Sequence, residues 1–136
     1  AKAWVSRSLA DGIDLLLLSR HGPVGVDIEP RRRPIPPAVL RRLLSTAESA
    51  WSDPARPELA LLAWCAKEAL TKALGRVIAY GQQRLQLGPP PVARSGLVRI
   101  RLAAAEGPAA QWRWRIVGDL GSEHVLVAAE ARPLEA

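Results

Sequence analysis

Disulfides and membrane spans are the first features that this sequence lacks. It has a single cysteine in 136 residues, so no disulfide can form within the chain. No run approaches the ~20 continuous apolar residues that cross a bilayer, and the first residues do not have the layout of a signal peptide. We therefore expect a cytoplasmic protein in a reducing compartment, with no membrane partner.

Histidine, methionine and the aromatic residues other than tryptophan are also scarce or absent. Phenylalanine and methionine are absent, tyrosine occurs once and histidine twice, so the aromatic core must rest on five tryptophans. His21 and His124 have no neighbouring residues at metal-ligand spacing, and Cys65 has no histidine at triad-like spacing. We expect no zinc or thiol chemistry and interpret Cys65 as a packing residue.

The composition that is present favours one folded domain over residues 1–136. The apolar content of 49% is high enough for a proper core at this length. Nineteen basic residues against thirteen acidic ones give a net charge of +6. That balance favours an acidic partner, which by charge alone is a nucleic acid, a phosphorylated cofactor, an anionic membrane or an acidic protein.

Hydrophobic periodicity and turn residues predict an α+β domain with an antiparallel sheet. The second and third strands, Ile13–Ser19 and residues 23–29, are expected to pair as a hairpin. A serine with a glutamate three residues later predicts a capping box at 45–48. In chain order, the expected elements are strands at 3–8, 13–19 and 23–29, helices at about 37–44, 45–51 and 58–74, and strands at 84–87, 97–102, 111–117 and 124–130.

The chemistry-bearing residues fall in two of these elements. In the long helix, Glu68 and Lys72 lie one turn apart on one side, next to Trp64. In the strand P-V-G-V-D-I-E, alternation places Asp27 and Glu29 on one face. Three carboxylates that converge suit a hard divalent cation, and a lysine beside them suits a phosphate.

The two stretches together resemble the signature of the 4′-phosphopantetheinyl transferases. Those enzymes carry G-[IV]-D-[ILV]-E and then [WF]-[SCT]-x-K-E-[SA]-x-x-K; here the stretches read G-V-D-I-E and W-C-A-K-E-A-L-T-K. V-S-R-S at 5–8 is similar to the S-H-S turn of the larger members, which serve peptide synthetases, and residues 111–130 resemble their closing strands. The implied fold is an antiparallel sheet packed against one long and one or two short helices.

The resemblance implies an enzyme of the holo-[acyl-carrier-protein] synthase type. It would transfer 4′-phosphopantetheine from coenzyme A to a serine of an acyl or peptidyl carrier protein, in fatty acid, polyketide or nonribosomal peptide biosynthesis, and release adenosine 3′,5′-bisphosphate. Asp27, Glu29 and Glu68 are implied to hold Mg²⁺, and Lys72 and Lys67 to neutralise phosphate charge. Glu68 or a water on the metal is implied as the base. No nucleic-acid partner is expected.

The chain departs from the family pattern in two ways. Arg7 replaces the histidine that contacts the 3′-phosphate of coenzyme A; arginine can make that contact but cannot accept a proton near neutral pH. Only one of the two similar halves of the larger members is present. We therefore expect either a homo-oligomer, as a dimer or trimer, or a fragment that lacks the coenzyme-binding half. Arg31 and its two neighbouring arginines would then bind coenzyme A or an acidic partner.

Two other classes of function fit part of the pattern. A metal-dependent nuclease would explain acids and lysines on a basic protein, but such sites usually lie on adjoining strands, whereas here the lysines flank Glu68 on a helix. A non-catalytic member of the fold would bind coenzyme A or a carrier protein without turnover. The intact metal and lysine positions favour the transferase over this non-catalytic reading.

Overall fold

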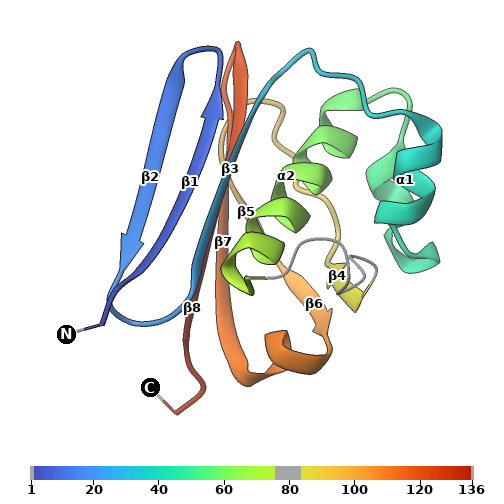
Figure 1. Cartoon of the computed structure of the whole chain (residues 1–136). Helices are drawn as coiled ribbons and strands as arrows, with labels where there is room; N and C mark the ends of the chain where they lie inside the picture. The colour runs from blue at the N-terminus through green and yellow to red at the C-terminus, as the bar shows by residue number, and fades with distance from the viewer. Residues whose placement is uncertain (1, 76–83, 136) are drawn as a thin grey trace.

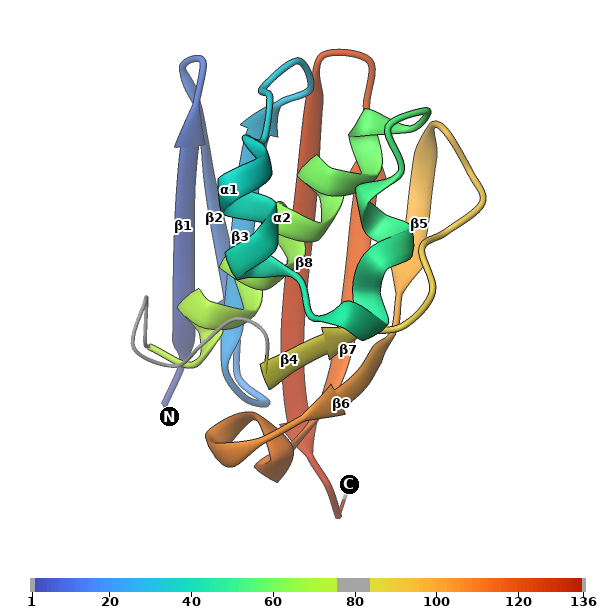
Figure 2. The ribbon, with the colours of Figure 1, turned by 90° about the vertical axis from the view of Figure 1, so that its right-hand side faces the viewer.

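The fold is centred on a four-stranded antiparallel sheet with a long helix, α2, across one face (Figures 1 and 2). The computed structural model describes residues 2–75 and 84–135. This arrangement confirms the predicted α+β class. The strand order is β3 (Val24–Pro30), β8 (His124–Pro133), β7 (Trp112–Leu120) and β5 (Gly96–Ile100).

The predicted hairpin between Ile13–Ser19 and residues 23–29 is wrong. Instead, β2 (Ile13–Ser19) pairs with β1 (Trp4–Ala10), and β3 pairs with β8 from the other end of the chain. The reason is the Asp11-Gly12 turn, where both residues have positive φ, 51° and 77°. Two such residues fit the two-residue turn whose twist matches paired strands, so the chain closes the hairpin there.

The β1–β2 hairpin is joined to β3 through serine side chains. Ser6 Oγ accepts the backbone N–H of Val26 at 3.0 Å, and Ser8 Oγ accepts that of Ile28 at 3.1 Å. Alternation along β1 turns both serines toward β3 and leaves Arg7 on the opposite, exposed face. The hairpin thereby lies against the edge of the sheet that carries the predicted site residues.

The helices follow a proline-rich connector at 31–37. They are α1 (Pro37–Leu43), the 3₁₀ helix η1 (Thr46–Ser52) and α2 (Pro57–Ala73), followed by a further 3₁₀ helix, η3 (Gly107–Gln111). The predicted capping box is present, and in it the Ser45 N–H donates to Glu48 Oε1 at 2.9 Å. The long helix ends as predicted at a glycine, Gly75, whose φ is +69°. None of the helices in the described ranges is long and apolar enough to cross a bilayer.

The strand predicted at 97–102 is two strands. β5 ends at Ile100 and joins the main sheet, while β6 (Leu102–Ala105) turns away and pairs with β4 (Leu85–Leu87). Figure 2 shows this small second sheet below η1 and α2. The core between α2 and the main sheet is almost wholly aliphatic. Its fully buried members include Leu62, Ala66, Leu70, Ile116, Val125, Val127 and Ala129.

Candidate active site

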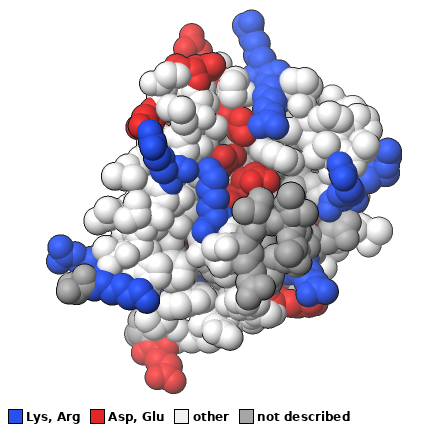
Figure 3. All heavy atoms as spheres, in the orientation of Figure 1, with Lys and Arg blue, Asp and Glu red and all other residues white. Residues whose placement is uncertain are grey.

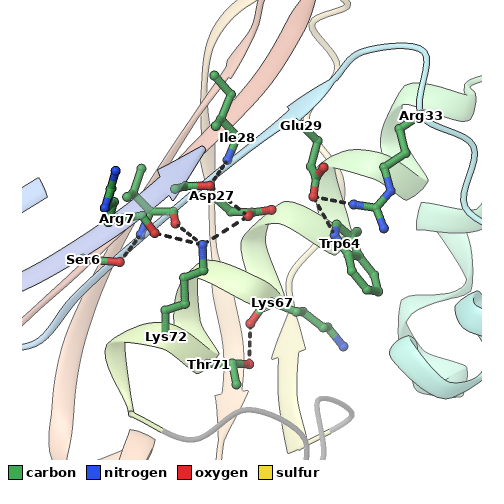
Figure 4. A network of polar contacts seen from close by, with 12 residues as sticks. Ser6, Arg7, Asp27, Ile28, Glu29, Arg33, Trp64, Lys67, Thr71 and Lys72 are labelled. Carbon is green, nitrogen blue, oxygen red and sulfur yellow. Dashed lines mark hydrogen bonds and ion pairs between the residues drawn. The ribbon is translucent and has the colours of Figure 1, made fainter. Parts of the chain in front are cut away.

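Asp27 and Lys72 meet where β3, α2 and the β1 hairpin come together (Figure 4). Lys72 Nζ lies 3.4 Å from Asp27 Oδ1 and donates to the carbonyl oxygen of Val26 at 2.9 Å. It also donates to the carbonyl oxygen of Arg7 at 3.3 Å. Asp27 and Lys72 therefore lie close together, as predicted. Lys72 also connects α2 with β3 and β1.

The Asp27 carboxylate is held in a setting that favours a cation. Its side chain is 8% exposed, and within the described residues its Oδ2 atom has no hydrogen-bond partner. Burial, together with the charge of Glu29 and against the opposing effect of Lys72, raises the pKa of Asp27 to about 6. Burial beside these acids also raises the pKa of the Cys65 thiol, which suits a packing residue.

Glu29 lies two residues further along the same face of β3 but is turned toward other partners (Figure 4). Its Oε2 accepts from Arg33 at 2.5 Å and from Trp64 Nε1 at 3.3 Å. The Arg33 guanidinium in turn lies 5.0 Å from the centre of the Trp64 ring. Sequence analysis placed Trp64 near the site and named Arg33 only as one of three basic residues of the connector; it did not predict the pairing of Arg33 with Glu29, because that contact depends on how the connector turns after β3.

The third predicted metal ligand, Glu68, is half-buried on α2, one turn before Lys72. Among the residues that the structure describes, no three acidic, histidine or cysteine side chains are already gathered around one point. Asp27 nevertheless fits a divalent cation, because its buried Oδ2, which has no donor among the described residues, would be satisfied by a hard cation, and the Glu29 carboxylate follows on the same face of β3. These residues therefore fit Mg²⁺, with Glu68 on the adjoining helix.

Lys67 is not brought to this cluster. Its ammonium is fully buried and bonds to Glu48 Oε1 at 2.7 Å and to the carbonyl oxygen of Leu43 at 2.6 Å. Glu48 also accepts from the backbone N–H groups of Ser45 and Leu87. Burial lowers the pKa of Lys67, against the effect of Glu48. The pair ties α2 to η1, α1 and β4.

Arg7 and Arg31, two of the arginines predicted to bind coenzyme A, are also engaged within the protein. The Arg7 guanidinium makes a bidentate pair with Asp14 at 2.8 and 2.7 Å on the outer face of the hairpin. Arg31 donates to the carbonyl oxygens of Gly121 and Arg94 at 2.7 and 2.9 Å. Neither side chain contacts Lys72 or Asp27 in these bonds.

A groove of about 920 Å³ lies beside the cluster, between the 31–37 connector, α1 and the start of α2. Arg33 belongs both to its lining and to the contact with Glu29. Its charged lining residues are four arginines and two acids, Asp53 and Glu58. The basic residues of the lining are Arg31, Arg32, Arg33 and Arg41, and its larger apolar residues are Ile35 and Leu40.

The raised pKa of Asp27 gives a testable pH dependence. In EDTA, we expect Asp27→Asn to be as stable as the wild type near pH 4 and more stable by about 2 kcal/mol near pH 7. The folded state holds the Asp27 proton more tightly than the unfolded chain, so this stability is present at low pH and lost as pH rises through about 6. Urea unfolding at both pH values measures the difference, and a constant gap between the variants would contradict it.

Comparison with known proteins agrees with the two motifs. The profile of the 4′-phosphopantetheinyl transferase superfamily matches residues 23–129, which include β3, α2 and the main sheet but not the β1–β2 hairpin. No curated protein sequence matches the chain significantly. Because the matched region covers most of the chain and contains both halves of the Asp27–Lys72 cluster, the chain belongs to the 4′-phosphopantetheinyl transferase superfamily.

Proposed function

We propose that this chain transfers the 4′-phosphopantetheine group of coenzyme A to a serine of an acyl or peptidyl carrier protein, with Mg²⁺ and in the cytoplasm. Adenosine 3′,5′-bisphosphate is the other product. The observation that carries the proposal is the Asp27–Lys72 pair: a buried carboxylate, one oxygen of which has no hydrogen-bond partner among the described residues, lies beside a partly exposed ammonium. Together they supply a cation ligand and a phosphate ligand at one point.

The roles of the residues follow from their positions. Asp27, Glu29 and Glu68 would hold Mg²⁺, which when bound supplies charge neutralisation across the pyrophosphate. Lys72 would leave the carbonyl oxygens of Val26 and Arg7 to contact a phosphate oxygen. Glu68, one turn away on α2, is the protein group proposed to take the serine proton.

The carrier protein is proposed to dock in the groove beside Glu29. An acidic helix with apolar side chains would suit a groove whose lining has more arginines than acids and also contains apolar residues. Figure 3 shows acidic atoms near the centre of one face of the molecule with basic side chains on both sides of them. A cation bound at the acidic centre would be attracted electrostatically, and so would an acidic partner bound at the basic margin.

The test is intact-mass spectrometry of apo carrier proteins incubated with this chain, coenzyme A and Mg²⁺. We expect a gain of one phosphopantetheine group, abolished by EDTA and slowed about 100-fold or more in Glu68→Gln. Coenzyme A binding by Glu68→Gln is measured alongside to show that the variant still folds and binds. No gain with several acyl and peptidyl carriers would overturn the proposal.

A non-catalytic member of the fold is the second candidate. It is favoured by the Arg7–Asp14 pair, which occupies the side chain that would contact the 3′-phosphate, and by the absence of three gathered acids among the described residues. Such a protein would bind coenzyme A or a carrier without any change in carrier mass. The same experiment therefore separates the two candidates.

A second copy of this chain is the further partner that we propose, as a dimer or trimer. Large apolar side chains are exposed on the outer face of the β1–β2 hairpin, around the Arg7–Asp14 pair. Self-association would remove this surface from water. Sedimentation velocity at micromolar concentration distinguishes such an oligomer from a monomer. The apolar residues are Val5, Leu9, Leu16 and Leu18.

A further inference from the structure

The Glu29 carboxylate is already paired with a cation of the protein. Arg33 and Trp64 both donate to the same oxygen, Oε2, and Arg33 also lies over the Trp64 ring. The Glu29 side chain is only 15% exposed, whereas that of Arg33 is 41% exposed. Glu29 is therefore the fixed member of this trio and Arg33 the member that solvent reaches.

We propose that Arg33 competes with the divalent cation for Glu29 and thereby sets the cation affinity of the site. This inference rests on the proposed function, because it concerns the metal that the transfer requires. Arg33 is a positioning residue here: it acts through Glu29 and contacts no substrate. When the cation binds, Arg33 leaves Oε2 and its guanidinium moves toward the adjoining groove.

Charge repulsion gives the physical reason. A divalent cation on Asp27 and Glu29 would stand close to a guanidinium that is bonded to one of those carboxylates, and like charges at such separations disfavour each other. Trp64 carries no charge, so its N–H can stay on Glu29 when Arg33 departs. The exchange therefore removes the repulsive group and keeps one bond that orients the carboxylate.

The adjoining groove can receive the Arg33 guanidinium when it leaves Glu29. Arg33 is part of the lining of the 920 Å³ groove, next to Arg31 and Arg32. An acidic group of a partner in this groove would accept the guanidinium and so reduce the cost of releasing Glu29. Occupation of the groove and binding of the cation would then favour each other, as linked equilibria must.

The experiment measures Mn²⁺ binding by electron paramagnetic resonance in the full chain, with Mn²⁺ as a probe for the hard oxygen site. Arg33→Ala is compared with Arg32→Ala, which removes the same charge from the same connector. Arg32 is exposed, and its side chain has no hydrogen bond or ion pair to the described residues. We expect Arg33→Ala to bind Mn²⁺ about tenfold more tightly than the wild type, and Arg32→Ala to change the affinity less than about threefold.

Each other result overturns the inference. Equal tightening in both variants would show an effect of net charge alone, and unchanged or weaker binding in Arg33→Ala would show that Arg33 does not compete. Absence of Mn²⁺ binding in all three proteins would show that there is no cation site for Arg33 to oppose. Because the readout is binding, it stands apart from the carrier mass assay: a chain without transfer activity can still give the expected affinities.

Discussion

Replacing Gly25 by alanine is expected to destabilise the protein by about 3 kcal/mol or more. Gly25 lies on β3 where α2 crosses it, and a Cβ atom there would stand 1.7 Å from the carbonyl oxygen of Ala69 and 2.6 Å from its carbonyl carbon. Both clashing atoms belong to the helix backbone, so no side-chain rotation relieves the contact. The helix itself would have to move away from the sheet.

The measurement is urea or thermal unfolding of Gly25→Ala beside a matched glycine variant, Gly88→Ala. At Gly88 the new Cβ would first meet the Cβ of exposed Arg101, at 3.1 Å, and Gly88 does not have a positive φ. We expect the control to cost less than about 1 kcal/mol. A Gly25→Ala protein that melts within a few degrees of the wild type would show that α2 does not need this close approach.

The same close approach of helix and strand explains why a glycine precedes the two acids in the stretch G-V-D-I-E. Asp27 follows Gly25 on the same face of β3, and Lys72 follows Ala69 by nearly one turn of α2. The distance between the two charged groups is therefore set by how closely the helix backbone lies on Gly25. A helix displaced by a methyl group would carry Lys72 away from its 3.4 Å contact with Asp27.

The sequence was sufficient to predict those parts of the site whose arrangement depends on local periodicity. Alternation placed Asp27 and Glu29 on one face of a strand, and helical spacing placed Glu68 and Lys72 on one side of α2. Pairing of distant strands was not accessible in this way, because β3 and β8 are held together by contacts between residues about 100 apart in the chain. The Asp11-Gly12 turn was the local signal for the β1–β2 hairpin.

The position of Lys67 could not be predicted from helical periodicity alone. Its neighbour Glu68 is half-buried while Lys67 is fully buried, although both lie in the same turn of α2. The difference arises because η1 covers one side of the helix and supplies Glu48 as a partner. The capping box revealed Glu48 as a helix-start residue, but its second bond, to a lysine 19 residues later, depends on the packing of η1 against α2.

Breaking this buried pair on one side is expected to cost about 3–5 kcal/mol. In Lys67→Met, the Glu48 carboxylate would keep its two backbone donors but lose the ammonium that neutralises it. In the double variant Lys67→Met with Glu48→Gln, no charge remains buried and the amide oxygen can still accept a backbone N–H. We expect the double variant to recover about 2 kcal/mol relative to Lys67→Met, measured by urea unfolding in a double-mutant cycle.

The double variant also decides what Lys67 does in the site. If the lysine is a structural partner of Glu48, the stable double variant should bind coenzyme A within about threefold of the wild type, since a change below that corresponds to less than about 0.7 kcal/mol. Lys72→Met, which removes the partly exposed ammonium beside Asp27, serves as the comparison and should weaken that binding clearly more. A folded double variant that loses coenzyme A affinity as strongly as Lys72→Met would instead show that Lys67 leaves Glu48 to bind a phosphate.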